Sequence, residues 1–388
     1  MRKVLTQAKL LSKDDLTAIA AYFYPAELIS SIDVLGSGNV NDTFLVTLKG
    51  VDPLERFVMQ RLNRQVFDRP DLVMSNMLTL INHVESKLVL DQPGLRGRRW
   101  EIPKVLKTQG LDAHWIENDG NFWRCITHIN YASTFDVIGD SKCAREVGYA
   151  LGMFHYLISD LPNEDLADTL ENFHVTPNYL LQYDLAITTL SNTGLLSTDN
   201  DARLDSVMKF VESRRSGVDV LEAALNRGEL SKRPIHGDPK INNVMIDNDT
   251  CQAVGLIDLD TVKPGLVHYD IGDCLRSSCN PAGEEAVDLS QVRFDLSLCE
   301  SILDGYLSVA SGFLSDRDYH YIPYCIRLIP FELGLRFLTD HLNGNTYFKT
   351  NRPDQNLDRA EVQFQLTASI ESQWTSIVEL IGRLRSQS

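Results

Sequence analysis

The chain has 388 residues, 43% of them hydrophobic and 23% charged, and a formal net charge of −16. This length indicates two domains or two lobes with ample core, and the acidic balance disfavours nucleic acids and anionic membranes as partners. Seven cysteines occur without a CxxC pair, and no apolar run approaches the ~18 residues of a membrane-spanning helix, so we expect a reduced cytoplasmic protein.

The first third of the chain predicts a small lobe rich in strands. Helical spacing of apolar residues comes first, and runs rich in β-branched and aromatic residues follow it. The pair Asp119-Gly120 is a hairpin turn signal between two such runs. In chain order we expect a helix over 13–29, a strand pair ending with strand 43–48, a strand over 56–60, a helix over 70–90, and strands over 115–117 and 122–126.

From about residue 127 the pattern becomes mainly helical. Val147, Leu151, Phe154 and Ile158 fall on one face of a helix. Two short apolar runs, 243–246 and 253–257, flank an Asp-Asn-Asp turn and predict a hairpin. Further helical patterns occupy 204–228, 288–313, 319–343 and 359–385. We therefore expect an α+β fold with a β-rich lobe over 1–126 and a larger helical lobe over 127–388.

A motif in the second lobe carries the strongest chemical signal. It reads IHGDPKINN over 235–243 and is followed by GLIDLD over 255–260. Asp238 precedes the amide Asn243 by five residues, and Asp258 follows an apolar strand. That is the order of a kinase centre: a base for the acceptor hydroxyl, then two oxygen ligands for the Mg²⁺ on ATP. Each piece alone has a simpler alternative, because a His-x-Asp triplet arises by chance and an Asp after a strand often forms a turn.

These motifs resemble the aminoglycoside phosphotransferase and choline kinase superfamily of small-molecule kinases. Four further segments resemble its N-acetylhexosamine 1-kinases: GSGNVNDTF (36–44), MQRLN (59–63), DLDTV (258–262) and FELGLRFLTD (331–340). The resemblance covers about residues 16–375 and implies a bilobal, protein-kinase-like fold. It also implies ATP and Mg²⁺ as cofactors, with Asp238 as catalytic base and Asn243 and Asp258 as metal ligands. His236 is expected to brace the loop backbone.

The resemblance implies a nucleotide site in the first lobe. Gly36 and Gly38 would let backbone amides approach the phosphates, although such a turn is often only a hairpin. Asn41 and Thr43 belong to the same segment, and Ile126 and His128 lie in the expected adenine-binding hinge.

One position departs from the usual kinase pattern. Gln60 stands where kinases usually place a strand lysine that holds the α- and β-phosphates. Glu85 is a weak candidate for the helix glutamate that pairs with such a lysine. We interpret the change as a trait of the sugar-kinase subgroup.

The acceptor is expected to bind near Arg336, Asp340 and Tyr347. Arg336 and Asp340 stand four residues apart in an otherwise apolar helical segment and would share a face. The simpler alternative is a surface ion pair, which contributes little stability. A guanidinium and an aromatic ring suit sugar hydroxyls and an acetamido group. Asp260 and Arg276 are secondary candidates.

Three hypotheses remain open from the sequence. The first is an ATP-dependent kinase that phosphorylates the anomeric hydroxyl of an N-acetylhexosamine. The second is a kinase of the same fold with another acceptor: an aminoglycoside, choline, homoserine or a different sugar. The third is a nucleotide binder without turnover, motivated by the missing strand lysine. The partners in the first two cases are ATP and a small molecule, and the oligomeric state is open.

Overall fold

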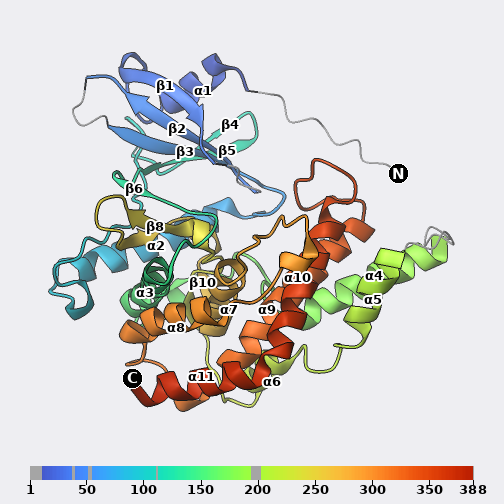
Figure 1. Ribbon diagram of the computed structural model, residues 1–388. Helices are drawn as coiled ribbons and strands as arrows, with labels where there is room; N and C mark the ends of the chain where they lie inside the picture. The colour runs from blue at the N-terminus through green and yellow to red at the C-terminus, as the bar shows by residue number, and fades with distance from the viewer. Residues whose placement is uncertain (1–10, 37–39, 51–54, 111, 194–201, 388) are drawn as a thin grey trace. The chain divides into compact units, whose positions relative to one another are not determined.

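The computed structural model describes residues 11–36, 40–50, 55–110, 112–193 and 202–387. The chain divides into two compact units, one containing the described residues of 1–74 and 103–130 and the other those of 75–102 and 131–388. The first is built on a sheet and the second is mainly helical (Figure 1). The predicted α+β class is confirmed, whereas the lobe boundary between 126 and 127 stays a prediction.

The first unit is a five-stranded antiparallel sheet in the order β1-β2-β3-β5-β4. Leu16, Ile19 and Phe23 of the N-terminal segment pack into one core cluster with sheet residues such as Phe57 and Trp123. The elements are α1 (Lys13–Ala20), β1 (Ile29–Val34), β2 (Asp42–Leu48), β3 (Arg56–Leu62), β4 (Ile116–Asn118) and β5 (Asn121–Thr127). Helix α2 (Pro70–Leu88) begins in this unit and continues into the second.

The predicted strands and the hairpin at 119–120 are confirmed, but the first helix is shorter than predicted. It ends at Ala20 rather than at residue 29, and a 3₁₀ turn over Ala26–Leu28 leads into β1. Pro25 precedes that turn, and proline removes a backbone donor and clashes with the preceding turn of a helix. The sequence already indicated a break at Pro25, but the helix ends five residues earlier, at Ala20.

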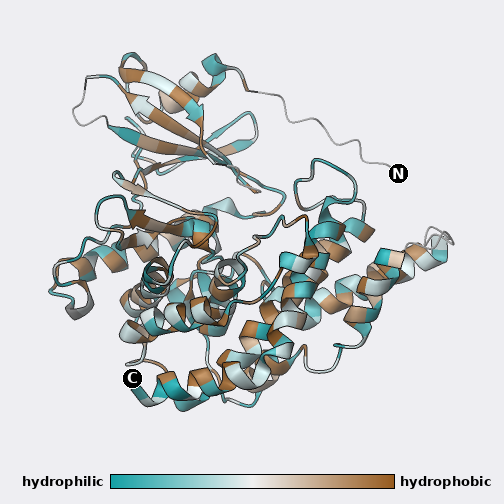
Figure 2. Cartoon of the chain, viewed as in Figure 1, coloured by the Kyte–Doolittle hydropathy of each residue, from teal (hydrophilic) through white to brown (hydrophobic). Residues whose placement is uncertain are grey.

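The second unit is built mainly from helices, together with two small sheets. Brown and teal residues alternate along many of these helices in Figure 2, as expected for helices with one buried face. The helices are α3 (Ser141–Ile158), α4 (Thr176–Thr193), α5 (Ala202–Glu212), α6 (Val220–Asn226), α7 (Val267–Ser278), α8 (Leu296–Ala310), α9 (Asp316–Leu342), α10 (Gln355–Ser372) and α11 (Trp374–Gln387). None of the described helices is both long and apolar enough to cross a bilayer.

Three predicted helical stretches are interrupted in the structure. The pattern over 204–228 divides into α5 and α6, separated by a segment with Gly217 at φ +88°. The pattern over 359–385 divides into α10 and α11 at Gln373, whose side chain donates to the carbonyl of Phe294. The pattern over 288–313 divides into a 3₁₀ turn (Leu289–Gln291) and α8, which begins where Asp295 accepts hydrogen bonds from two backbone amides.

Helices α3 and α8 approach closely because glycines line their contact. A Cβ atom added to Gly148 would lie 1.8 Å from the carbonyl oxygen of Ile302, and one on Gly305 would lie 1.9 Å from that of Arg145. Only residues without a side chain fit there. This contact fixes the position of α3, whose last turn carries His155. His155 contacts Asp270, which holds the loop around Asp238.

Two short antiparallel pairings position the functional loops. Strand β7 (Arg233–Ile235) pairs with β10 (Lys263–Gly265), and β8 (Val244–Asp247) pairs with β9 (Ala253–Leu256) and with the short β6 (Ala132–Ser133). The predicted hairpin at 243–257 is therefore confirmed. The loop after β7 carries Asp238, and the segment after β9 carries Asp258.

Candidate active site

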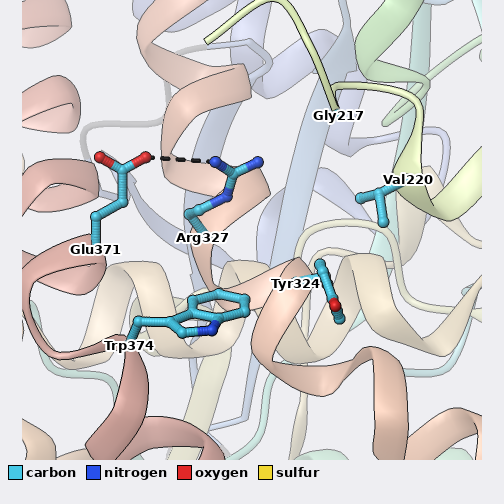
Figure 3. A pocket seen from close by; sticks show the side chains of 6 residues that line it. All are labelled: Gly217, Val220, Tyr324, Arg327, Glu371 and Trp374. Carbon is cyan, nitrogen blue, oxygen red and sulfur yellow. Dashed lines mark hydrogen bonds and ion pairs between the residues drawn. The ribbon is translucent and has the colours of Figure 1, made fainter.

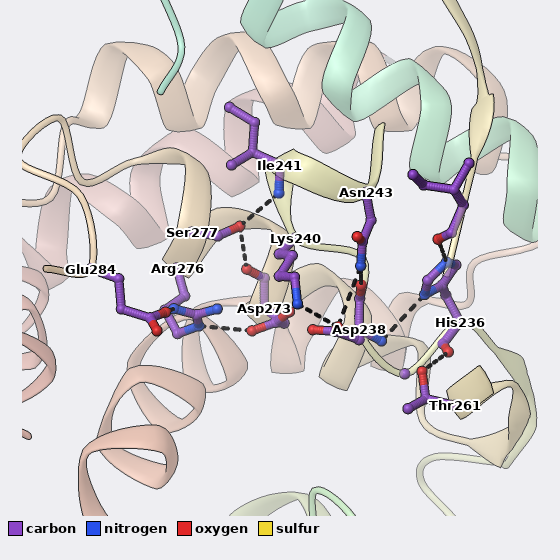
Figure 4. Close-up of polar contacts among 12 residues, drawn as sticks. His236, Asp238, Lys240, Ile241, Asn243, Thr261, Asp273, Arg276, Ser277 and Glu284 are labelled. Atoms are coloured by element: carbon purple, nitrogen blue, oxygen red, sulfur yellow. Dashed lines mark hydrogen bonds and ion pairs between the residues drawn. The ribbon is translucent and has the colours of Figure 1, made fainter. Parts of the chain in front are cut away.

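Asp238 lies between a cation and an amide from its own loop (Figure 4). Its Oδ2 accepts from Nζ of Lys240 at 2.8 Å and from Nδ2 of Asn243 at 3.3 Å. The same Asn243 nitrogen donates to the backbone oxygen of Asp238 at 2.7 Å. The side chain of Asp238 is 27% exposed, and no contact in the described part of the chain occupies Oδ1. The carboxylate is thus fixed through one oxygen while the other can accept a proton.

A buried carboxylate holds the backbone of this loop. Asp270 of α7 accepts from the amides of His236 at 2.7 Å and Gly237 at 2.9 Å, and it contacts Nε2 of His155 at 2.8 Å. These contacts tie α7 to the loop before Asp238. Gly237 has φ +86°, and a Cβ there would lie 2.7 Å from the oxygen of Thr261, so the turn requires glycine.

His236 has contacts that fit the expected bracing role. Its Nε2 lies 3.0 Å from the oxygen of Ile257, and its backbone oxygen accepts from Oγ1 of Thr261 at 2.8 Å. Burial lowers its pKa below the usual value of 6.5. Since the ring is buried and bonded to backbone, it ties the catalytic loop to the segment around Asp258.

Asp258 is brought close to the other two residues of the motif. It follows β9 in a left-handed conformation with φ 64°, and the preceding amide of Ile257 donates to the oxygen of Asn243 at 2.9 Å. Burial lowers the pKa of Lys240, but the carboxylates of Asp238 and Asp258 raise it above its usual value overall. The structure therefore gathers Asp238, Asn243 and Asp258 around one lysine.

The oxygens of Asn243 and Asp258 fit a Mg²⁺ ion that also binds phosphate. Because Nδ2 of Asn243 donates to Asp238, its Oδ1 is the atom left to face a cation. No cluster of three or more His, Cys, Asp or Glu side chains suitable for a metal occurs in the residues that the structure describes. A site with one carboxylate and one amide is what Mg²⁺ uses when phosphate and water complete its shell.

Asp273 and Arg276 of α7 form a second polar group next to the loop. Arg276 donates to Asp273 at 2.7 Å and to Glu284 at 2.9 Å, and its side chain is 4% exposed. Burial raises the pKa of Asp273, but Arg276 lowers it below its usual value overall. Oδ2 of Asp273 is buried without a hydrogen-bond partner among the described residues. Asp260, the other secondary candidate, is 2% exposed.

Arg336 of α9 lies among four aromatic rings. The centroids of Phe173, Tyr179, Tyr347 and Phe348 are 5.3, 5.0, 5.9 and 5.5 Å from its guanidinium carbon. Burial lowers its pKa, but the neighbouring Tyr179, Tyr347 and Glu332 raise it overall. The predicted pair of Arg336 and Tyr347 is thus brought together.

Asp340 does not pair with Arg336, so the surface ion pair considered above is wrong. Its carboxylate accepts from the amides of Thr346, Tyr347 and Phe348 at 2.9, 2.8 and 3.0 Å and from Nδ2 of Asn356 at 2.9 Å. Asp340 is 5% exposed. These contacts indicate that Asp340 holds the loop carrying Tyr347.

In the first unit, Gln60 lies in a polar row across three strands. Thr43 of β2, Gln60 of β3 and Arg124 of β5 are directly opposite one another in the sheet register. Nε2 of Gln60 donates to Thr43 at 3.3 Å, while Nε and Nη2 of Arg124 donate to Oε1 of Gln60 at 3.0 and 2.7 Å. Arg124 is 1% exposed. A cation therefore stands beside the position that lacks the lysine, supplied by the neighbouring strand.

The other predicted nucleotide residues have these positions. Gly36 has φ +71°, and Gly38 lies outside the described residues. Oδ1 of Asn41 accepts from the amide of Asn63 at 3.0 Å. Ile126 pairs with Val58 within β5, and Nδ1 of His128 lies 2.9 Å from Oδ1 of Asn130 just after that strand. Glu85 lies in α2.

Sequence reasoning missed Lys240, Arg124 and His174. Lys240 stands two residues after Asp238, and a cation so close to a base and a metal ligand was a usable signal. The role of Arg124 could be recognised only from the strand register, which places it opposite Gln60. His174 contacts Gly237, 63 residues away, and Glu332, 158 residues away, and no periodicity reveals such contacts.

A cavity of about 330 Å³ occurs elsewhere in the second unit (Figure 3). Tyr324, Trp374 and the ion pair of Arg327 with Glu371 contribute to its walls. None of the residues predicted for catalysis or binding lines it, so it is not part of the candidate site.

Known proteins resemble the chain in both sequence pattern and fold. A family model described as the phosphotransferase enzyme family matches residues 31–295. A microcompartment-associated aminopropanol kinase has a TM-score of 0.59 at 15% identity, covering 95% of this chain and 99% of that one. An aminoglycoside phosphotransferase from Alicyclobacillus acidocaldarius has a TM-score of 0.58 at 15% identity, covering 94% and 96%. A spectinomycin phosphotransferase solved with ADP and spectinomycin has a TM-score of 0.56 at 9% identity, covering 95% and 99%.

These structures share the fold, which confirms the protein-kinase-like architecture expected from the sequence. The N-acetylhexosamine subgroup stays a prediction. Since the family model spans more than half of the chain, this protein belongs to the phosphotransferase enzyme family of small-molecule kinases.

Proposed function

We propose that this protein transfers the γ-phosphoryl group of ATP to the anomeric hydroxyl of an N-acetylhexosamine, giving the sugar 1-phosphate. The observation that carries the phosphoryl transfer is the fixed carboxylate of Asp238, held by Lys240 and Asn243 through one oxygen. A base in that state can orient an acceptor hydroxyl and take its proton. The use of ATP is supported by the kinase order of the motif and by the ADP bound to a relative of the same fold.

In this proposal the acceptor oxygen attacks the γ-phosphorus in line with the leaving ADP. The new P–O bond forms as the bond to the β,γ-bridging oxygen breaks, and that oxygen leaves with the bonding electrons. The acceptor proton passes to Oδ1 of Asp238. Asn243 and Asp258 would hold Mg²⁺, which supplies positive charge for the phosphates. Lys240 offsets the charge of the carboxylates.

The charge near Arg336 favours a neutral acceptor over an amine. A cage of four aromatic rings could bind a cationic ligand, but here the guanidinium of Arg336 already occupies it. A choline-like or polyamine acceptor would then face a positive charge. Sugar hydroxyls and an acetamido oxygen can instead accept hydrogen bonds from Arg336. The cage thus supports a sugar.

The test is turnover with Mg-ATP and a panel of GlcNAc, GalNAc, glucose, galactose, choline, homoserine and kanamycin, with the product identified by ³¹P NMR. A sugar 1-phosphate from GlcNAc or GalNAc is the expected product. Asp238→Asn should lower kcat by about 10²–10⁴-fold while ATP binding is retained. Phosphorylation of an amine-bearing acceptor would discard the assignment of Arg336, and ATP binding without any transfer would favour the non-catalytic binder.

A further inference from the structure

The catalytic loop has a second buried partner on the side opposite Asp270. His174 precedes α4 and is 4% exposed. Its Nε2 lies 2.8 Å from the backbone oxygen of Gly237, and its Nδ1 lies 2.9 Å from Oε1 of Glu332 on α9. The amide of Gly237 donates to Asp270. Both backbone groups of the residue before Asp238 are therefore bonded to buried side chains.

The two partners of His174 are both hydrogen-bond acceptors. A backbone carbonyl has no proton to donate, and Glu332 also accepts from Oγ1 of Thr176 at 2.7 Å. A neutral imidazole donates from only one nitrogen, whereas an imidazolium donates from both. The imidazolium is therefore the form of His174 that can donate a hydrogen bond to both partners.

We infer that His174 is a positioning residue, an imidazolium that fixes the Gly237 carbonyl and couples the catalytic loop to α9. This inference rests on the proposed role of Asp238. Glu332 stands one helical turn before Arg336 on α9, so His174 connects the loop of the base to the helix of the proposed acceptor site. Its backbone has φ 64°, an uncommon conformation for a residue with a side chain, and the contacts with Gly237 and Glu332 hold the residue there.

The acidic groups around the ring raise the pKa of His174. Burial lowers the pKa of His174, but Glu332 of α9 and Asp273 of α7 raise it, and overall it lies above 6.5. Tyr269 of α7 stacks on the ring at 5.4 Å, and its hydroxyl donates to Glu222 of α6 at 2.8 Å. The acidic surroundings thus stabilise the charged imidazole.

Deprotonation of His174 would disturb the loop in a defined way. The remaining proton would stay on Nδ1, because the carboxylate of Glu332 is a stronger acceptor than a carbonyl. Nε2 would then present a lone pair to the Gly237 oxygen at 2.8 Å. The carbonyl would be repelled and Asp238 would shift, so kcat should fall as the pH rises through the pKa of His174.

Two conservative variants separate the contacts of His174. The amide nitrogen of glutamine in His174→Gln can replace Nε2 and still donate to Gly237, whereas that of asparagine in His174→Asn can replace Nδ1 and donate only to Glu332. His174→Asn should lower kcat by about ten- to a hundredfold, the range for lost supporting partners, with little change in the KM for ATP. His174→Gln should retain more of kcat and lose the alkaline fall. The control His83→Gln, in α2, should keep the wild-type kcat and pH profile.

The charge of His174 is measured independently of turnover by ¹⁵N NMR of histidine-labelled protein, with His174→Gln assigning the signal. Both ring nitrogens should be protonated at pH 6.5 and below, and Glu332→Gln should move the titration to lower pH. A single neutral tautomer below pH 6.5 would overturn the inference even if the kinase is active. Equal kcat for His174→Gln and His174→Asn, with loss of stability only, would reduce His174 to a structural role. Absence of transfer by the wild type, with the imidazolium observed, would instead reject the proposed function.

Discussion

Individual side chains divide into those that the motif revealed and those that only tertiary contacts reveal. Asp238, Asn243 and Asp258 are predictable because loop and strand signals place them in a fixed order along a short stretch of chain. Arg124 and His174 are not, since each acts through a residue at least 63 positions away. Asp340 was predicted to lie beside Arg336 in the acceptor site. In the structure it instead accepts hydrogen bonds from backbone amides.

Arg124 provides the first test of the nucleotide site. If it supplies the charge that a strand lysine supplies in other kinases, Arg124→Gln should raise the KM for ATP by about 10–100-fold, as for a lost hydrogen bond to a charged group. The double variant Gln60→Lys with Arg124→Gln returns a cation to β3 and should recover part of the loss. Steady-state kinetics with varied ATP gives both values.

The matched control is Arg61→Gln. Arg61 is the next residue on β3, its side chain points to the other face of the sheet, and it pairs with Asp42. Its loss should leave the KM for ATP near the wild-type value. An unchanged KM in Arg124→Gln would assign the phosphate charge to another residue.

Asp340 and Arg336 should affect the acceptor rather than ATP. Asp340→Ala removes the acceptor of three backbone hydrogen bonds and frees the loop that carries Tyr347. We expect the KM for the sugar to rise about tenfold or more in both Asp340→Ala and Arg336→Ala, with the KM for ATP unchanged. A larger effect on ATP than on the sugar in either variant would contradict the acceptor assignment.

Helices and strands were predicted more reliably in kind than in extent. Strands β2, β3, β5, β8 and β9 were predictable because each is a short apolar run with turn residues next to it. The helix pattern extended too far at residues 21–29, 213–219 and 373, although Pro25 already indicated a break in the first of these stretches. Gly217 at positive φ lies in the second, and the side chain of Gln373 donates to the carbonyl of Ser369 at the end of α10. Loop conformations such as those of Gly237 and His174 depend on distant partners, so propensity could not specify them.

The glycine contact of α3 and α8 gives a test of how helix packing supports the site. Gly148→Ala should lower the free energy of unfolding by ~1–3 kcal/mol, because its Cβ would overlap the carbonyl of Ile302 and force the helices apart. Gly382→Ala in α11 is the control: no atom lies within 4 Å of its Cβ, so alanine should stabilise the helix by up to ~1 kcal/mol.

Urea unfolding measures both glycine variants, and kcat reports on the site. Because α3 carries His155 to Asp270, Gly148→Ala should also lower kcat. Equal stability changes of the two variants would show that the helices can separate at little energetic cost.

Glu222 should contribute a loss of stability as the pH rises from about 5 to 7. Burial raises the pKa of Glu222 from 4.5 to about 7. Between these values the unfolded chain has lost the proton that the folded chain retains, so folding becomes less favourable with pH. His174, whose pKa is also raised, adds a loss above pH 6.5.

The free energy of unfolding at pH 5 and pH 8 measures this effect. In Glu222→Gln the loss over that range should be smaller by ~1–3 kcal/mol, given 1.36 kcal/mol for each unit of pKa shift. Identical pH dependence in the wild type and the variant would mean that Glu222 titrates normally in the folded protein.

The cation beside β3 also matters for chemical labelling. Reagents built on ATP that acylate the strand amine of kinases would find a carboxamide at Gln60 and a guanidinium at Arg124, neither of which acylates readily. Strand β3 contains no lysine between Arg56 and Leu62, whereas Lys240 places one primary amine beside Asp238 in the other unit. Such reagents should therefore modify the catalytic loop and leave the sheet unlabelled, so a survey that detects kinases by their strand lysine would overlook this protein.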